Sequence, residues 1–379
     1  MIDASLFLKQ LTTSGYTFFT GVPDSLLSAF CSEITQEADQ LCHITAANEG
    51  GAIALAAGYH LGTGKIPVVY MQNSGLGNAV NPLLSLVDEE VYQIPMLLII
   101  GWRGRPGTKD EPQHIKQGRV TTSLLDTMEI PYFVVCQSTD YDSLIEKVTS
   151  LIQNTGIPHA LVIAPDTFEK SNHQPTAAEG KGNLSREEAL KVVVGELGSQ
   201  DIIVSTTGKL SRELFEYRES KKESHQQDFL TVGSMGHASQ IAAGITLSNP
   251  DRHVVCLDGD GALLMHLGAL AINTTIGLTN FTHIVFNNGS HESVGGQPTV
   301  AQDIDLCAIA SACGYNDVLS ISPKTTIELK LMLQSKMSLK SAKPVFVEIV
   351  VDKKSRADLG RPTMSAKENK KTFMKFLAE

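Results

Sequence analysis

The chain has 379 residues, of which 42% are hydrophobic and 19% charged, a composition that excludes disordered, collagen-like and coiled-coil proteins. Its 41 Asp and Glu residues outweigh 31 Lys and Arg residues. The net charge of −10 disfavours nucleic acid as a partner, because binding it requires neutralisation of phosphates. No apolar run approaches the ~20 residues that cross a bilayer, so a membrane is not an expected partner either.

The N-terminal segment and the cysteines indicate the compartment. The segment MIDASLFLKQLTTSG lacks the basic region and following apolar stretch of a signal peptide. The six cysteines form no CxxC pair and show no Cys/His spacing typical of a metal site. These features predict reduced thiols and a cytoplasmic location.

Short apolar runs alternate with helical periodicity through the first half of the chain. Continuous apolar runs are typical of strands buried on both faces of a parallel sheet. The predicted strands are 16–21, 66–72, 95–102, 131–135 and 158–164. The predicted helices are 25–38, 50–62, 78–88 and 141–153. Asp24 is the expected N-cap of the first of these helices.

A polar stretch rich in Lys, Glu, Asn, Gly and Pro, residues 167–185, predicts a linker between two halves. The second half repeats the alternation of strands and helices. Its predicted strands are 201–206, 228–233, 253–259, 281–288, 317–322 and 344–351, and its predicted helices include 186–197 and 305–314. We therefore expect an α/β protein with two doubly wound parallel-sheet domains, 1–168 and 186–379, joined by the linker 169–185 without a middle domain.

Two motifs follow neighbouring predicted strands of the second half. Gly259-Asp260-Gly261 ends one strand, and Asn287-Asn288-Gly289 follows the next after 25 intervening residues. Each motif alone is also a common tight turn. Together they place an acid and an amide at the ends of two strands, and oxygen ligands of this kind suit Mg²⁺ bound to phosphates. A helix beginning near Ala262 would offer N–H groups to a phosphate.

This pair of motifs resembles the diphosphate-binding signature of thiamine diphosphate enzymes. The resemblance implies that thiamine diphosphate and Mg²⁺ are cofactors. It further implies that the Asp260 carboxylate, the Asn288 side chain and the main-chain carbonyl of Ser290 bind the metal, with Gly259 and Gly261 beside the diphosphate.

Two further segments match the same family. In Gly233-Ser234-Met235-Gly236-His237, the resemblance assigns Gly233 to cofactor binding and Met235 to the apolar side chain that keeps the cofactor bent; a core methionine is the alternative. Glu49 lies at a predicted strand-to-helix junction, where it could simply cap the helix. The family places a Glu there against N1′ of the aminopyrimidine, so Glu49 is expected to bind the cofactor and to sustain its reactive tautomer.

The compact layout and the segments 21–25, 46–52, 233–239 and 287–299 resemble the phosphonopyruvate decarboxylase family over nearly the whole chain. The sulfopyruvate decarboxylases are close relatives and stay open as an alternative. The resemblance implies thiamine diphosphate- and Mg²⁺-dependent decarboxylation of 3-phosphonopyruvate, a small anionic 2-oxo acid, to phosphonoacetaldehyde and CO₂. It also implies a homo-oligomer, at least a dimer, because the family's cofactor lies between the first half of one subunit and the second half of another.

A basic segment, residues 102–114, follows the predicted strand 95–102 where a ligand would bind. Its cations suit the extra anionic group of a phosphonate or sulfonate, although a solvated loop is the alternative reading. The expected substrate-binding residues of the first half are Asp24, Arg103, Arg105, Lys109 and His114. Of these, Asp24 and His114 are also the candidates for catalytic proton transfer, beside Glu49.

His291 and Glu292 follow the metal-binding motif and are further candidates for contact with the substrate. A protein of another class, a non-catalytic α/β protein that binds a cofactor or nucleotide, would use GDG as a turn. The chain has neither GxGxxG after its first strand nor a P-loop, which disfavours a nucleotide site. Acetolactate-type carboligation is disfavoured because the family's middle domain is absent.

Overall fold

The computed structural model describes residues 1–37, 41–169, 181–336 and 343–379. The chain divides into two units, Met1–Thr176 with His291–Gln297 and Ala177–Ser290 with Pro298–Glu379. Most of the predicted linker, residues 170–180, lies outside the described residues. Each unit is considered by itself below.

The first unit is built on a six-stranded sheet with the order β2-β1-β3-β4-β6-β5, in which all neighbours are parallel. Its strands are β1 (Phe18–Gly21), β2 (Cys42–Thr45), β3 (Val68–Gln72), β4 (Leu97–Gly101), β5 (Tyr132–Val135) and β6 (His159–Ile163). The five strands predicted in this half are confirmed, with slightly shorter bounds.

The strand β2 was missed because it lies at the edge of the sheet and pairs with β1 alone. In Cys42–Thr45 the side chains are exposed or half-buried in alternation, so no continuous apolar run marks it. By contrast, every residue of β4, Leu97–Gly101, is buried. Burial on both faces is what makes a central parallel strand readable from sequence.

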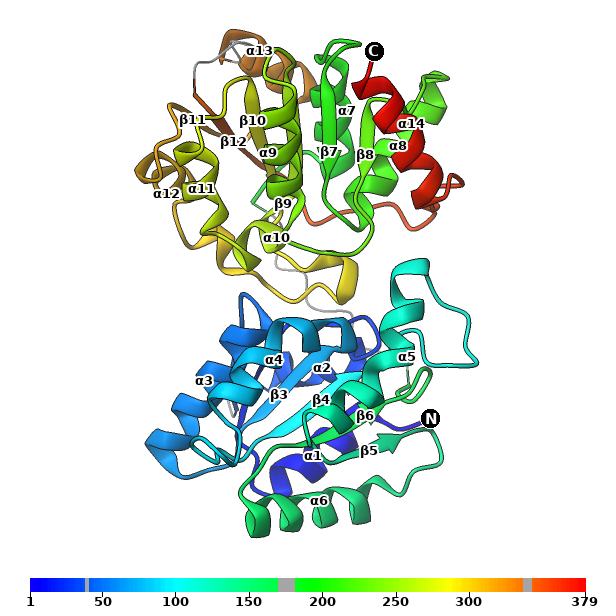
Figure 1. Ribbon diagram of the computed structural model, residues 1–379, viewed down its shortest axis with the longest axis vertical. Helices are drawn as coiled ribbons and strands as arrows, with labels where there is room; N and C mark the ends of the chain where they lie inside the picture. The colour runs from blue at the N-terminus through cyan, green and yellow to red at the C-terminus, as the bar shows by residue number, and fades with distance from the viewer. Residues whose placement is uncertain (38–40, 170–180, 337–342) are drawn as a thin grey trace. The chain divides into compact units, whose positions relative to one another are not determined.

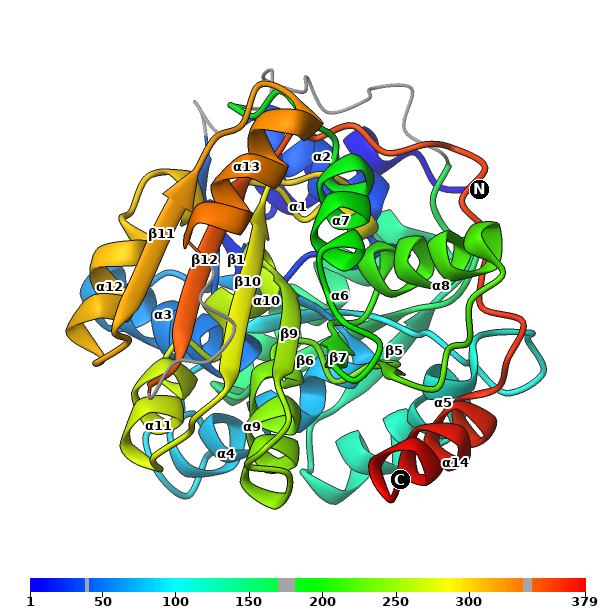
Figure 2. The same ribbon diagram turned by 90° about the horizontal axis from the view of Figure 1, so that it is seen from above.

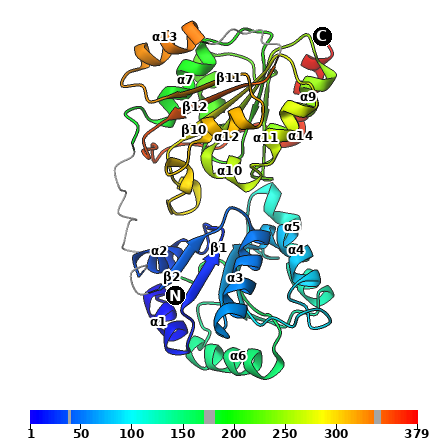
Figure 3. The same ribbon diagram turned by 90° about the vertical axis from the view of Figure 1, so that its left-hand side faces the viewer.

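Helices cover both faces of this sheet (Figures 1 and 3). One face packs against α1 (Ala4–Thr13), α2 (Ser28–Gln36) and α6 (Tyr141–Thr155). The other packs against α3 (Glu49–Thr63), α4 (Leu76–Ser85) and α5 (Pro112–Thr127), with a short 3₁₀ turn, η1 (Asn73–Gly75), leading into α4. Figure 3 shows β1 and β2 between α2 and α3.

The expectation that Asp24 caps the first predicted helix is wrong. The N-cap of α2 is Leu27, and no side chain caps this helix. The Asp24 carboxylate instead accepts a hydrogen bond of 2.6 Å from Nε2 of Gln72, at the end of β3. Its other oxygen, Oδ2, accepts the N–H of Leu26 at 3.2 Å, a local contact that lies before the first residue of α2.

The second unit holds another six-stranded parallel sheet, with the order β11-β12-β10-β9-β7-β8. Its strands are β7 (Ile202–Ser205), β8 (Asp228–Leu230), β9 (Val254–Gly259), β10 (Phe281–Asn287), β11 (Asp317–Ile321) and β12 (Val345–Val350). Figure 2 shows β11, β12, β10, β9 and β7 side by side in this order. All six predicted strands of this half are confirmed.

The helices of the second unit also cover both faces of their sheet. One face packs against α7 (Arg186–Gly195), α8 (Lys209–Lys221) and α13 (Thr326–Lys336). The other packs against α9 (Ala238–Ser248), α10 (Asp260–Met265), α11 (Ala269–Thr275), α12 (Leu306–Ala312) and α14 (Ala366–Leu377). Two doubly wound α/β units without a middle domain confirm the predicted fold class.

Candidate active site

The predicted site residues gather at the carboxyl ends of parallel strands, where α/β sheets bind ligands. Apart from His291 and Glu292, which are described separately below, they fall into two groups, one on each unit. The first group, on the first unit, contains Asp24, Glu49, Arg103, Arg105, Lys109 and His114. The second group, on the second unit, contains Gly233, Met235, Gly259, Asp260, Gly261, Asn288 and Ser290.

Glu49 is the first residue of α3, directly after the N-cap Asn48. Its side chain is buried, with a relative exposure of 5%. Nδ2 of Asn78, on α4, donates a 2.7 Å hydrogen bond to Oε2 of Glu49. Oε1 lies against Gly75, where an added Cβ would approach to 2.4 Å. The absence of a side chain at Gly75 therefore allows the carboxylate its position.

Asp24 is fully buried after β1, at the carboxyl edge of the first sheet. Burial raises the pKa of its carboxyl group, while the hydrogen bond from Gln72 and the charge of Arg103 partly oppose that rise. A Cβ on Gly101 would lie 2.1 Å from Oδ2, so β4 must end in glycine for Asp24 to fit. A buried carboxyl with a raised pKa is suited to holding a proton.

Gln72 is a residue that the sequence analysis missed. Besides donating to Asp24, it accepts a 2.7 Å hydrogen bond from the Ser74 hydroxyl through Oε1. Its signal in the sequence was a polar amide closing the apolar run 66–72, at the strand end where ligands bind.

The basic segment does not present three unpaired cations. Arg103 binds Asp110 through two hydrogen bonds, Nε to Oδ2 at 2.8 Å and Nη2 to Oδ1 at 2.5 Å, and donates a third to the Ser25 hydroxyl. The Asp110 carboxylate therefore offsets much of the charge of Arg103. The Arg105 guanidinium lies over the Trp102 ring, 5.4 Å from its centroid, and Lys109 is exposed.

His114 lies in the first turn of α5, which corrects the expectation of a loop position. The segment 112–114 is helical because Pro112 takes the first helical position, where proline is favoured. His114 is buried, and burial, together with the nearby charge of Arg103, lowers the pKa of its imidazole to about 4. The imidazole is therefore neutral at pH 7.

On the second unit, the two motifs meet at the ends of neighbouring strands, since Gly259 pairs with Phe286. Asp260 begins α10, two residues earlier than expected, and Gly261 is the second residue of that helix. The Asp260 carboxylate is 3% exposed and accepts hydrogen bonds from the Thr299 hydroxyl and from main-chain N–H groups, including that of Asn288. Burial raises the pKa of Asp260 to about 6.

Asn288 and Ser290 form a tight turn after β10. The main-chain N–H of Ser290 donates a 3.0 Å hydrogen bond to Oδ1 of Asn288. Asn288 and Ser290 are both buried. Thr299, the hydrogen-bond partner of Asp260, was missed because nothing in the local sequence marks a contact that spans 39 residues.

Gly233 and Met235 lie in the loop between β8 and α9. The N–H of Gly233 donates a 3.1 Å hydrogen bond to the Thr207 hydroxyl, after β7. Gly233 has a φ of 72°, in the left-handed region, and β8 ends at Leu230, three residues earlier than predicted. Met235 is half-buried and lies in a turn, outside the buried core of this unit.

His291 and Glu292 follow Ser290 but belong to the first unit. The N–H of His291 donates to the carbonyl of Gln297 at 2.8 Å, and Glu292 begins the 3₁₀ turn η2 (Glu292–Val294). These contacts close the segment 291–297 into a loop.

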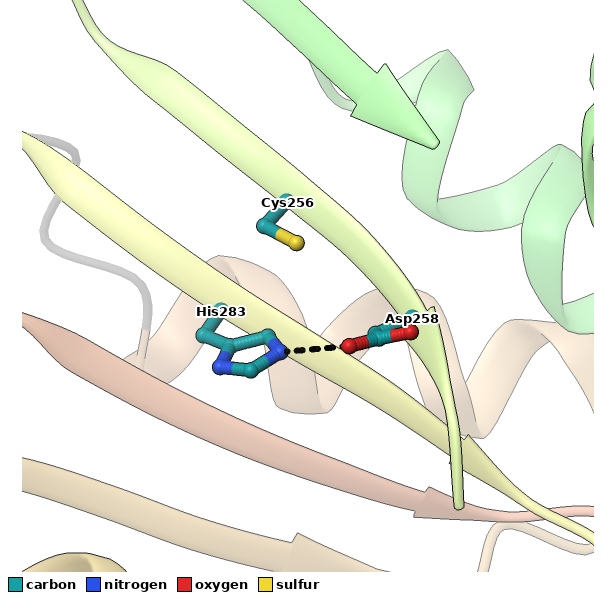
Figure 4. A group of neighbouring side chains, drawn as sticks. All are labelled: Cys256, Asp258 and His283. Carbon is teal, nitrogen blue, oxygen red and sulfur yellow. Dashed lines mark hydrogen bonds and ion pairs between the residues drawn. The ribbon is translucent and has the colours of Figure 1, made fainter. Parts of the chain in front are cut away.

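A buried cluster of Cys256, Asp258 and His283 lies on β9 and β10 (Figure 4). Nε2 of His283 and Oδ2 of Asp258 form a 3.3 Å contact, and Oδ1 of Asp258 accepts the N–H of Gly259 at 3.0 Å. Burial raises the pKa of the Cys256 thiol. Through the N–H of Gly259, the cluster is connected to the residue that precedes Asp260.

The donor sets match the groups that the resemblance implies. Asp260, the Asn288 amide and the Ser290 carbonyl offer only oxygen, as a hard divalent cation requires. The buried carboxylate of Asp260 also gains from a cation, because burial alone disfavours its charge. Glu49 offers a buried carboxyl already oriented by Asn78. Both groups of residues fit their expected ligands.

Two doubly wound units, each matched by a family model, are those of a thiamine diphosphate-dependent enzyme. The family model described as "Thiamine pyrophosphate enzyme, N-terminal TPP binding domain" matches residues 3–130. The model described as "Thiamine pyrophosphate enzyme, C-terminal TPP binding domain" matches residues 206–349. With the relatives described next, these matches show that the chain belongs to the thiamine pyrophosphate enzyme family. Its cofactor is thiamine diphosphate.

Three curated relatives show where the chain lies within this family. Phosphonopyruvate decarboxylases of Streptomyces viridochromogenes and Streptomyces hygroscopicus are each 34% identical, over 100% of this chain and 95% of theirs. A sulfopyruvate decarboxylase of Methanosarcina acetivorans is 28% identical, over 73% of this chain and 74% of its own. Among the described residues, no helix has the length and apolar character needed to span a membrane.

Proposed function

We propose that this enzyme decarboxylates 3-phosphonopyruvate to phosphonoacetaldehyde and CO₂, with thiamine diphosphate and Mg²⁺ as cofactors. The observation that carries the proposal is the similarity to two phosphonopyruvate decarboxylases along the entire chain. Both halves, and therefore both groups of site residues, are included in that similarity.

The proposed Mg²⁺ ligands are the Asp260 carboxylate, the Asn288 side-chain oxygen and the Ser290 carbonyl. Their role is to hold the metal against the diphosphate of the cofactor, with Gly259 and Gly261 beside it and with Gly233 and Met235 contacting the rest of the cofactor.

Thiamine diphosphate, when bound, supplies the electron sink that allows the carboxylate of a 2-oxo acid to leave as CO₂. Glu49 is proposed to hold a proton against the cofactor's aminopyrimidine, with Asn78 fixing the orientation of its carboxyl group. Asp24 is proposed to keep a proton for the product, because its burial favours the protonated form. Neutral His114 is proposed to act as a hydrogen-bonding group rather than as a cation.

The substrate's phosphonate is proposed to bind the basic segment. Asp110 and Ser25 take three of the five N–H donors of Arg103, so its guanidinium retains donors for an anion. Arg105 and Lys109 supply further positive charge, and His291 and Glu292 are proposed to contact the substrate from the loop 291–297.

Sulfopyruvate is the second candidate substrate. The Methanosarcina relative aligns across both halves of this chain, so a fused chain does not by itself distinguish the two activities. We further propose that the protein is a cytoplasmic homo-oligomer of at least two subunits. Analytical ultracentrifugation would measure the mass of this oligomer.

The test is CO₂ release from phosphonopyruvate, sulfopyruvate and pyruvate in parallel, with thiamine diphosphate and Mg²⁺ present. We expect the highest kcat/KM for phosphonopyruvate. A preference for sulfopyruvate would overturn the substrate assignment while retaining the family. Release from none of the three would overturn the proposed decarboxylation.

A further inference from the structure

Glu348 is a buried acid in the middle of β12, with a relative exposure of 8%. Its Oε1 accepts a 2.7 Å hydrogen bond from Nδ2 of Asn287, and its Oε2 accepts one of 2.6 Å from the Ser320 hydroxyl. The Cys307 thiol lies 4.0 Å from Oε2. These donors are an amide, a hydroxyl and a thiol, so hydrogen bonds rather than an ion pair compensate the burial of the carboxyl group.

Asn287, the last residue of β10, connects Glu348 to the turn that carries the proposed metal ligands. Its Nδ2 also donates to the carbonyl of Ala301 at 3.2 Å, and its Oδ1 accepts the N–H of Gly289 at 3.0 Å. The amide side chain thus uses both of its donor hydrogens and its oxygen within the protein. Asn287 consequently shapes the turn that carries the following residue, Asn288, one of the proposed metal ligands.

Asn287 is also connected to Asp260, through Ala301 and Thr299. Ala301 lies in the 3₁₀ turn η3 (Val300–Gln302), whose N-cap is Thr299. The N–H of Thr299 donates to the carbonyl of Gly289 at 3.0 Å, and the hydroxyl of Thr299 donates to Asp260. Holding Ala301 and Gly289 therefore also places the hydroxyl that orients the Asp260 carboxylate.

We infer that Glu348 is the positioning residue of the proposed metal site, acting through Asn287 on the turn 287–290 and on Thr299. The inference rests on the proposed function, because it takes Asp260, Asn288 and Ser290 as the ligands. Outer residues that orient metal ligands typically change metal affinity about 10–100-fold when they are replaced.

The test measures the Kd of Mn²⁺, used as a spectroscopic substitute for Mg²⁺, by electron paramagnetic resonance in the presence of saturating thiamine diphosphate. Glu348→Leu should raise the Kd about 10–100-fold. At saturating metal, kcat should return close to the wild-type value, because the ligands themselves are intact. Glu348→Gln should restore the affinity, because its side-chain oxygen can accept the hydrogen bond from Asn287.

Ser320→Ala is the matched control, since it removes a donor to Oε2 without touching Asn287, and its Kd should stay near the wild-type value. Combining Glu348→Leu with Asn287→Ala should raise the Kd no further than Asn287→Ala alone, because the two residues act in series. A purely structural role would give additive losses. Thermal unfolding of each variant without metal verifies that it is folded.

Two outcomes distinguish a failure of this inference from a failure of the proposed metal site on which it rests. If Asp260→Asn binds Mn²⁺ as well as the wild type does, the proposed metal site is wrong and the inference falls with it. If Asp260→Asn loses the metal while folded Glu348→Leu keeps wild-type affinity, only the inference is overturned. Should Glu348→Leu not fold, Glu348→Asp replaces it, because the shorter side chain retracts from Asn287 and should raise the Kd in the same way.

Discussion

Glu49 offers a direct test of the proposed proton transfer, because glutamine keeps its volume and an oxygen that can accept the hydrogen bond of Asn78. Glu49→Gln removes only the exchangeable proton. We expect kcat to fall about 10²–10⁴-fold, the usual contribution of general acid–base catalysis. The measurement is CO₂ release at saturating substrate and cofactor.

Thiamine diphosphate binding, followed by calorimetry, serves as the control for Glu49→Gln. It separates loss of turnover from loss of the cofactor. An unchanged kcat in a variant that binds the cofactor normally would remove Glu49 from the chemistry.

Gln72 provides a test of the pH dependence through its hydrogen bond to Asp24. That bond lowers the pKa of Asp24 against the rise caused by burial, so Gln72→Leu should raise the pKa further. If protonated Asp24 supplies the product's proton, activity is lost as the pH rises through this pKa. The alkaline limb of the kcat profile should therefore move to higher pH.

The control for Gln72→Leu is Ser74→Ala, which removes the hydrogen bond to Oε1 of Gln72 but leaves the donor to Asp24 in place. Its pH profile should resemble that of the wild type. Equal shifts in both variants would contradict the role of the Gln72–Asp24 bond.

The turn η1 and helix α4 contain two glycines that differ in their surroundings. A Cβ at Gly75 would lie 2.4 Å from Oε1 of Glu49, whereas a Cβ at Gly77 would meet no atom within 4 Å. Gly75→Ala should destabilise the protein by about 1–3 kcal/mol, the usual cost of overpacking. Gly77→Ala should be neutral or stabilising by up to about 1 kcal/mol, because alanine favours the helix.

Urea unfolding of both variants measures this difference, and CO₂ release reports whether Glu49 is displaced with it. Equal stabilities for Gly75→Ala and Gly77→Ala would show that α3 and η1 can separate without cost.

Whether a strand or helix could be predicted from the sequence depends on its position in the fold and on the residues beside it. Central strands such as β4 and β10 were found, because burial on both faces leaves a continuous apolar run. The edge strand β2 was missed because its half-exposed side chains leave no such run. The start of α5 was read as a loop, because the charged residues beside it dominate the local composition.

His43 should make the stability of the folded protein depend on pH. Burial lowers the pKa of its imidazole to about 4, from an ordinary value of about 6.5. Between these values the unfolded chain binds more protons, so the contribution of His43 is present above pH 6.5 and is lost as the pH falls towards 4. The limiting slope for one group is about 1.4 kcal/mol per pH unit.

His43→Gln keeps a side chain able to hydrogen-bond the Tyr70 hydroxyl, which lies 2.8 Å from Nε2 of His43. The free energy of unfolding, measured in urea at pH 7 and pH 5, should fall less in this variant than in the wild type. The same fall in both proteins would show that His43 does not contribute to the dependence.

Local patterns along the chain were sufficient for the fold class and for the two motifs at strand ends. The roles of Glu49 and Asp260 came from the family resemblance and stay predictions. Hydrophobic periodicity and the spacing of short motifs depend only on residues near one another in the sequence. They can therefore be read from a single sequence. The pairings were decided by the tertiary structure. Asp24 turns to Gln72 across 48 residues, Asp260 to Thr299 across 39, and Asn287 to Glu348 across 61. Such partners are brought together only by the packing of the folded chain. The donors that this packing supplies set the pKa of a buried carboxyl group.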